Sequence, residues 1–240
     1  MKNTIKLILQ KLLGYERYLF VFSKFKIKNL KEDKKEGDFF LFMDEIIANG
    51  DVLDIGANIG IMTYHLSKKF PNKTIFSVEP MPNNLSILRK IITHYNLQNV
   101  TVKPFALGQQ KEEVEMVLPM NGKVKMQGLA HVVHDSIDEW NEGEKIKVQC
   151  ETLDHLFLDT PISGIKMDIE NFEFFALKGG CDLLKTYKPV VYLELWDNEN
   201  RTQCFEFLNQ LGYSAFVNQN NNLVPFDALK HKKQNFIFKI

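Results

Sequence analysis

The sequence predicts an α/β domain built on a mostly parallel sheet, and two observations lead to this fold class. The first is composition: of 240 residues, 45% are hydrophobic and 25% are charged, as is typical of a globular chain with a sizeable core. The second is an alternation, from Asp51 onward, of short β-rich runs with helical stretches of about ten to fifteen residues, which indicates βαβ units.

The first half of this region contains three predicted strands separated by helices. β-favouring residues dominate the strand runs, and the segment after Pro82 repeats Leu and Ile at helical spacing. We expect strands over 51–55, 74–78 and 100–107, and helices over 61–69 and 82–96.

Residues 113–150 interrupt the alternation. Two β-rich runs, 114–118 and 145–150, flank a polar and irregular stretch. We therefore expect an insertion beside the sheet, which forms a lid on the substrate side.

The alternation resumes at residue 164 and ends in an antiparallel hairpin. The expected elements are strands over 164–168 and 189–195 and helices over 172–187 and 199–211. The runs 213–217 and 235–240 predict the hairpin, with the Asn-rich segment 218–222 as the exposed turn between its two strands. Residues 50–240 are thus expected to form one domain.

Residues 1–49 precede this domain as a helical segment with an amphipathic pattern. Within residues 1–35 there are ten basic and three acidic residues, a net charge of +7, and apolar residues recur among the lysines at helical spacing. The first interpretation is a helix packed on the domain with its lysines in water, as in most soluble proteins. The alternative is a peripheral contact with an anionic membrane surface.

The overall composition argues against several classes of protein. Thirty basic and thirty acidic residues give no net charge, whereas general nucleic-acid binders carry a basic surplus. Cys150, Cys181 and Cys204 form no CxxC pair, so neither a zinc knuckle nor a disulfide framework is indicated. The sequence has no apolar run of transmembrane length and no signal-peptide pattern, so we expect a cytoplasmic protein. If the N-terminal helix contacts a membrane, we expect the protein to lie at its inner face. The oligomeric state stays open.

A glycine turn that follows the first predicted strand is the clearest local signal. Gly56 lets the backbone turn tightly and approach a ligand, and Gly60 lets the following helix pack closely. Asn58 occupies the second glycine position of the dinucleotide fingerprint, which disfavours a pyrophosphate held against the backbone.

Two carboxylates accompany this turn. Asp54, at the end of the first strand, suits a cationic or amino-bearing ligand. Glu79, at the end of the second strand, suits the two hydroxyls of a ribose, and the alternative for it is a solvated strand-end acid.

These residues carry a resemblance to a known family. The run 54–60, followed by 78–80 and Asn84, resembles the S-adenosylmethionine-binding half of a class I methyltransferase. The ordered series 151–154, 165–170, 172–173, 176–179 and 189–194 resembles the FkbM family of methyltransferases, so that the likeness covers about residues 50–240. One departure is Asn171, where the family usually has Gly; Asn tolerates left-handed backbone conformations.

The resemblance implies a Rossmann-like class I methyltransferase sheet, S-adenosylmethionine as methyl donor, and methylation of a hydroxyl on a sugar, glycan or related natural product. It implies that the turn surrounds the methionine end of the cofactor, that Glu79 binds the ribose and that the third strand end lines the adenine. The cofactor-binding residues expected in this way are Asp54, Gly56, Ala57, Asn58, Gly60, Glu79, Asn84, Phe105 and Ala106.

Asp168 and Glu170 are the expected catalytic residues, because they follow a strand at the carboxyl edge where α/β proteins bind ligands. Alternation along the strand aims both side chains to one side if the strand continues that far. The pair would withdraw the proton of the substrate hydroxyl, or hold a divalent metal with Glu194 as a further ligand. The alternative role is capping of the following helix, which fits Glu173 better than Asp168.

Two other function classes stay open at this point. One is a nicotinamide-dependent oxidoreductase on a similar sheet, which Asn58 and the lack of a Tyr-x-x-x-Lys pair disfavour. The other is a non-catalytic, methyltransferase-like partner subunit, which the intact Asp54, Gly56 and Asp168 disfavour.

Overall fold

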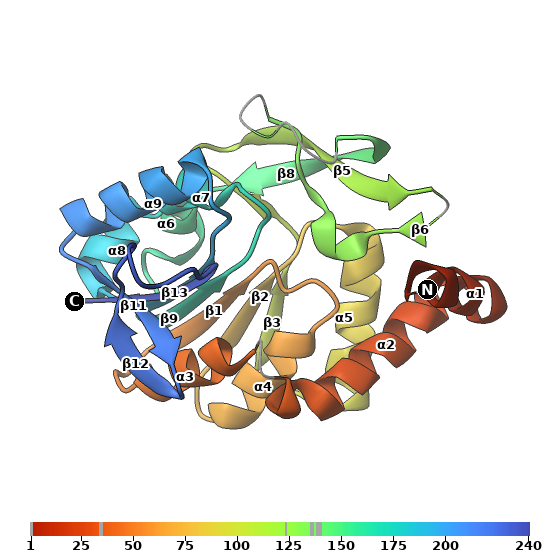
Figure 1. The fold of residues 1–240 in the computed structure, drawn as a ribbon, viewed down its shortest axis with the longest axis horizontal. Coiled ribbons are helices and arrows are strands. Elements are labelled where there is room, and N and C mark those ends of the chain that lie inside the picture. Colours follow the sequence, from red (N-terminus) through yellow and green to blue (C-terminus); the bar gives the residue numbers. More distant parts are fainter. Residues whose placement is uncertain (1, 34–35, 123, 135–136, 138–140) are drawn as a thin grey trace.

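The computed structural model describes residues 2–33, 36–122, 124–134, 137 and 141–240. An eight-stranded sheet crosses the middle of the molecule with helices on both faces, and a smaller five-stranded sheet stands beside it (Figure 1). None of the helices in the described parts of the chain has both the length and the apolar character needed to cross a lipid bilayer.

The central sheet is mostly parallel, as predicted. Five parallel strands are followed by three strands with antiparallel pairing. In spatial order they are β3 (Val100–Lys103), β2 (Ile75–Val78), β1 (Asp51–Ile55), β9 (Ile162–Met167), β10 (Val190–Glu194), β13 (Asn235–Lys239), β11 (Ser214–Gln219) and β12 (Asn222–Pro225). Because β1, β2, β9 and β10 are parallel, their carboxyl ends meet at one edge of the sheet.

The order in which the strands are connected at the antiparallel end of the sheet differs from the prediction. β11 does pair with β13, but β13 lies between β10 and β11, and the Asn-rich turn joins β11 to β12. The predicted position of that turn, between 213–217 and 235–240, was therefore wrong. Asn220 and Asn221 adopt positive φ, so that β12 can fold back locally on β11 before the last strand returns.

Two groups of helices cover the two faces of the central sheet (Figure 1). On one face lie α3 (Gly37–Glu45), α4 (Ile61–Lys69) and α5 (Pro82–His94), and on the other α6 (Leu153–Phe157), α7 (Glu173–Lys178), α8 (Cys181–Tyr187) and α9 (Glu199–Gln210). The single helix expected over 172–187 is split into α7 and α8. A Cβ on Gly179 would lie 2.1 Å from the Gly108 carbonyl oxygen, so the chain passes too closely there for a regular helix with side chains.

The predicted strand 100–107 is also divided. Pro104 lacks a backbone N–H, and β3 ends just before it, while β4 (Ala106–Leu107) joins the smaller sheet. That sheet consists of β4, β5 (Glu112–Asn121), β6 (Val124–Lys125), β7 (His131–Val132) and β8 (Gly143–Glu151), so that all of its strands but β4 lie at or within the bounds of the segment 113–150 to within one residue. Residues 123, 135–136 and 138–140 of the insertion lie outside the described residues.

The N-terminal segment forms α1 (Lys2–Leu13), α2 (Tyr15–Asn29) and the short 3₁₀ helix η1 (Leu30–Glu32). α2 runs along the outer edge of the molecule beside α4 and α5 (Figure 1). Leu19 and Ile27 of α2 pack against Ile87 and Ile91 of α5 in a separate hydrophobic cluster. This face of α2 packs on the domain as expected.

Candidate cofactor pocket and its carboxylates

A pocket lies at the carboxyl edge of the central sheet, between the glycine turn after β1 and the smaller sheet. It encloses about 580 Å³ of empty space, open solvent at its mouth included. Its lining residues are Ile55, Gly56, Asn58, Val78, Glu79, Pro80, Asn84, Phe105, Ala106, Leu107, Met116, Gln127, Gly128, Ala130, Val132, Asp168, Ile169, Glu170 and Phe172.

Most of the residues expected from the sequence meet in this pocket, and four do not. Gly56, Asn58, Glu79, Asn84, Phe105, Ala106, Asp168 and Glu170 line it, whereas Asp54, Ala57, Gly60 and Glu194 do not. The sequence reasoning missed the wall that the insertion supplies, including Met116, Gln127 and Val132. The β-rich runs of the insertion could have indicated this wall, but the sequence does not show that one of them pairs with β4.

The glycine turn has the backbone geometry that its sequence suggests. Gly56 has φ +70°, and a Cβ there would lie 1.9 Å from the carbonyl oxygen of Asp168. Gly60 has φ +82° and meets Leu88 of α5, so that it allows close helix packing. Asn58 also has positive φ, and its buried Oδ1 has no hydrogen-bond partner among the described residues. The backbone of the turn therefore lies in close contact with the segment that carries Asp168.

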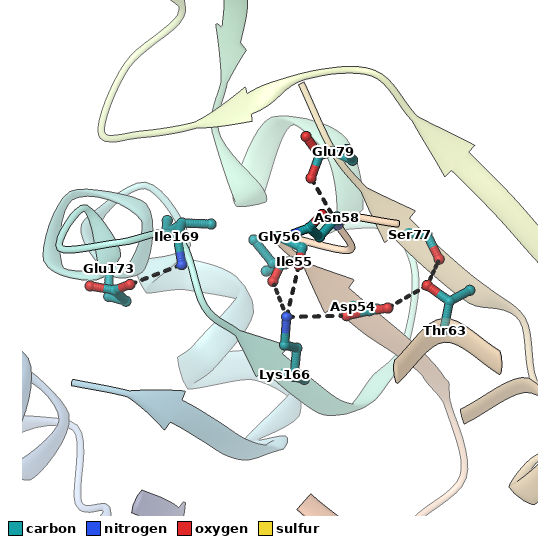
Figure 2. A network of polar contacts seen from close by, with 10 residues as sticks. All are labelled: Asp54, Ile55, Gly56, Asn58, Thr63, Ser77, Glu79, Lys166, Ile169 and Glu173. Carbon is teal, nitrogen blue, oxygen red and sulfur yellow. Dashed lines mark hydrogen bonds and ion pairs between the residues drawn. The ribbon is translucent and has the colours of Figure 1, made fainter. Parts of the chain in front are cut away.

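Glu79 is buried and binds the turn from the neighbouring strand (Figure 2). Its Oε2 accepts the Asn58 N–H at 2.8 Å, and its Oε1 accepts the Met81 N–H at 2.8 Å and Asn84 Nδ2 at 3.2 Å. Burial raises the pKa of Glu79 to about 7, although these hydrogen bonds lower it. With 4% of its surface exposed, Glu79 is not the solvated acid of the alternative interpretation.

Asp54 lies beneath the turn, where it meets Lys166 of β9 (Figure 2). Its Oδ2 accepts the Thr63 hydroxyl at 2.6 Å, and its Oδ1 lies 3.5 Å from Lys166 Nζ. Nζ donates to the carbonyl oxygens of Ile55 at 3.1 Å and Gly56 at 2.9 Å. Asp54 is completely buried and does not line the pocket, so we expect it to act on the turn through Lys166 rather than to contact a ligand.

Lys166 lies within a motif used above, but the sequence predicted no role for it. Burial lowers the pKa of Lys166, and the carboxylates of Asp54, Asp168 and Glu194 raise it, so that the pKa lies above its usual value. The ammonium group therefore remains charged and serves as the buried counter-ion of this edge of the sheet.

Asp168 and Glu170 follow β9 but not as part of a strand. β9 ends at Met167, the Asp168 N–H donates to the Ile55 carbonyl oxygen at 3.2 Å, and Glu170 and Asn171 both adopt positive φ. The condition for alternation, a strand that continues through Glu170, is thus not met. Asn171 takes the left-handed conformation that glycine would take in the family pattern.

The pKa of each of these two carboxyl groups is raised, but the charges that surround them differ. Burial, together with the negative charges of Asp168, Glu194 and Glu173, raises the pKa of Glu170 to about 9. Burial also raises the pKa of Asp168, but there the Lys166 ammonium opposes it. Near neutral pH, Glu170 therefore holds a proton and serves as a hydrogen-bond donor, while Asp168 is the better candidate for a base.

Glu173, the first residue of α7, is the carboxylate that organises this loop. It is buried, and it accepts the Ile169 N–H at 3.0 Å and Asn200 Nδ2 at 2.7 Å. Burial raises its pKa to about 7, against the lowering effect of the Ile169 hydrogen bond. Its carboxyl group thus fixes the backbone that leads into α7, but no side chain caps α7 from its N-cap position, so Glu173 holds the preceding loop rather than capping the helix.

Glu194, at the end of β10, faces a second and more polar cleft. Burial, together with the negative charge of Asp168, raises the pKa of Glu194 to about 7. The cleft holds about 2700 Å³ of empty space, open solvent included. Its ionisable lining residues are Lys31, Glu32, Asp33, Glu36, Asp38, Glu194, Asp197, Arg201, His231, Lys232 and Lys233. Among the described residues, no three His, Cys, Asp or Glu side chains are placed to hold a metal ion together.

Comparison with known proteins places this architecture among methyltransferases. The methyltransferase FkbM domain matches residues 54–217. Methyltransferase 1 of Beauveria bassiana (strain ARSEF 2860) is 23% identical over 163 residues, which are 62% of this chain and 65% of that protein. The crystal structure of methyltransferase FkbM from Methylobacillus flagellatus KT superposes with a TM-score of 0.53 at 17% identity, over 80% of this chain and 44% of that chain. The chain thus spans less than two thirds of the length of each of these relatives.

Proposed function

Because the chain belongs to the FkbM methyltransferase family, whose members use S-adenosylmethionine, we propose that it methylates a hydroxyl group of a sugar, glycan or related natural product. One observation carries this proposal: the glycine turn and Asp168 share one pocket, and a Cβ on Gly56 would strike the Asp168 carbonyl. A cofactor-binding backbone and a candidate base are thereby held side by side. Family membership also argues against the nicotinamide-dependent alternative.

The residues of the pocket fit S-adenosylmethionine. The side-chain-free backbone at Gly56 and the unpartnered Oδ1 of Asn58 suit its polar amino acid end, and Glu79 suits the ribose hydroxyls. Phe105 and Met116 give the apolar lining that an adenine ring needs. When bound, the cofactor supplies an electrophilic methyl group on a sulfonium, so the protein has mainly to align the acceptor and remove its proton.

Asp168 is the group that we assign to the acceptor proton. An alcohol is a poor nucleophile, and a carboxylate within hydrogen-bond reach of its hydroxyl withdraws the proton as methyl transfer proceeds. Lys166 keeps Asp168 from the full effect of burial on its pKa, and the protonated Glu170 beside it donates to an acceptor oxygen.

The acceptor class is inferred from the polar cleft beside Glu194. Its mixed acidic, basic and amide lining offers both donors and acceptors, as a ligand with many hydroxyls requires, and Phe226 adds one aromatic surface.

The test is binding followed by turnover. Calorimetry should show that S-adenosylmethionine binds and NAD does not. Incubation with the radiolabelled cofactor and a panel of monosaccharides, sugar nucleotides and glycolipid extracts should then transfer label to a hydroxyl, with Asp168→Asn as the inactive control. Binding without transfer to any extract would favour the non-catalytic partner subunit, and binding of NAD alone would reject the proposal.

A further inference from the structure

The exposed side of α2 presents basic and apolar side chains together. Arg17, Val21, Lys24, Phe25 and Lys28 fall within about 100° of the helix circumference, and we call these five residues the α2 stripe. Phe25 is 62% exposed and Val21 is 48% exposed, whereas Leu19 and Ile27 on the opposite side are buried in the domain. The stripe is therefore not a packing surface of this fold.

Other charged residues of α2 form ion pairs, whereas the cations of the stripe have no acidic partner among the described residues. Lys26 pairs with Asp33 at 2.9 Å, and Glu16 pairs with Lys90 of α5 at 2.9 Å. Within the described part of the chain, Arg17, Lys24 and Lys28 make no ion pair. Arg17 and Lys28 are exposed to solvent, and Lys24 is half-buried, with its Nζ 5.5 Å from the centre of the Phe20 ring.

The surface beside the stripe extends its charge. A groove between α2, α3 and α4 is lined by Lys24, Lys28, Lys31, Lys68 and Lys69, with one acid, Asp44, which Lys69 binds at 2.6 Å. The positive surface is therefore broader than one helix.

We propose that the α2 stripe docks the protein on an anionic lipid bilayer. Anionic headgroups would neutralise the lysines, while Phe25 and Val21 would enter the boundary between headgroups and acyl chains, as in interfacial helices. A nucleic acid would use the cations but leave the two apolar side chains without an apolar environment. A second copy of the chain would bring two positive stripes together, which is repulsive. This proposal does not depend on the proposed function, since docking requires neither cofactor nor acceptor.

The experiment is flotation of the full-length protein with vesicles of phosphatidylcholine alone or of phosphatidylcholine mixed with phosphatidylglycerol. We expect binding only to the mixed vesicles, and loss of binding in 1 M salt, where the Debye length shrinks to about 3 Å. Each cation near the surface contributes roughly fivefold to partitioning, so the Lys24→Gln/Lys28→Gln variant should bind about 25-fold less. Phe25→Ser should bind about tenfold less, because the variant has no aromatic ring to transfer from water into the bilayer.

Matched control variants distinguish binding by the α2 stripe from nonspecific binding of exposed apolar or basic side chains to vesicles. Leu229→Ser removes an apolar side chain that is 97% exposed elsewhere, and Lys178→Gln/Lys232→Gln removes two other exposed lysines. Both controls should float like the wild-type protein, and all variants should keep the wild-type thermal unfolding. Equal binding to neutral vesicles, equal losses in the controls, or no binding at low salt would overturn the proposal. So would a dimer in analytical ultracentrifugation that Phe25→Ser dissociates, or retention on single-stranded RNA without flotation.

Discussion

Lys166 Nζ lies 3.5 Å from Asp54 Oδ1 and at the same time holds the carbonyl oxygens of Ile55 and Gly56. One buried ion pair thus lies directly beneath the backbone of the glycine turn and holds it in place (Figure 2). Since Asp54 and Lys166 are register partners on β1 and β9, the pair also fixes these two strands relative to one another.

Replacing Lys166 alone should damage both the fold and the pocket. Lys166→Met leaves Asp54 charged and unpaired in the core, and we expect the free energy of unfolding in urea to fall by about 3–5 kcal/mol. The Asp54→Asn/Lys166→Met double variant should recover part of this stability, because residue 54 is then neutral and no longer leaves an unpaired charge beneath the turn. Calorimetry on the folded double variant should still show weaker S-adenosylmethionine binding, since the turn carbonyls have lost their donor.

Lys73→Met is the matched control for that pair. Lys73 Nζ also binds two carbonyl oxygens, those of Ala48 and Gly50, both at 2.7 Å, but it lies away from the pocket. Its replacement should leave cofactor affinity unchanged. A double variant at Asp54 and Lys166 with wild-type affinity would show that the ion pair does not position the turn.

Gly56→Ala should abolish measurable cofactor binding. The added Cβ would meet the Asp168 carbonyl oxygen at 1.9 Å, and φ +70° is itself unfavourable for alanine, so the turn must move away from Asp168. Gly212→Ala is the control, because Gly212 has φ +88° and a Cβ added there would have no neighbour within 4 Å. Both variants should lose about 1 kcal/mol or more of stability, but only Gly56→Ala should lose affinity in calorimetry.

Cofactor affinity should depend on pH through Glu79. Its pKa is raised from 4.5 to about 7, so the carboxyl is largely protonated in the free protein at pH 6 and ionised at pH 8. The ionised form accepts ribose hydroxyls on both oxygens, and affinity should therefore rise between these two pH values. Titration of Glu79→Gln should give weaker binding, by about 1.5–3 kcal/mol, with that rise removed. A pH dependence that survives in Glu79→Gln would locate the titrating group elsewhere.

Asp168 and Glu170 should respond differently to neutralisation. Asp168→Asn removes the candidate base and should lower kcat by about 10²–10⁴-fold with cofactor affinity nearly intact. Glu170→Gln should retain most activity at pH 7, because a carboxyl with a pKa of about 9 is already neutral there. Steady-state kinetics of both variants, with and without EDTA, also separates the base from a metal ligand. Equal losses in the two variants would mean that both carboxyls must ionise.

Features that depend on local sequence could be predicted, and features that depend on register could not. The glycine turn, Glu79 and the carboxyl-edge position of Asp168 follow from short motifs and from the rule that parallel strands end together. The role of Lys166 requires the pairing of β1 with β9, which brings Asp54 and Lys166 together across more than a hundred residues. Likewise, the difference between Asp168 and Glu170 arises from burial and neighbouring charges, which no spacing in the sequence reveals.

The antiparallel end of the sheet shows the same limit. The sequence indicates 235–240 as the partner of the run 213–217, and it does not predict the short strand 222–225, because Asn222 and Pro225 flank only two β-favouring residues there. In the structure β11 pairs with both, β12 on one side and β13 on the other.

The placement of β13 between β10 and β11 has a consequence for synthesis. A chain still growing on the ribosome reaches residues 235–239 after every other strand of the central sheet is made, yet those residues fill an interior position. Until then β10 has one open edge, and β11 with β12 forms a separate hairpin that exposes another. Such unpaired edges are where nascent chains join one another, so stalling or truncation before residue 235 should yield aggregates rather than a shortened enzyme.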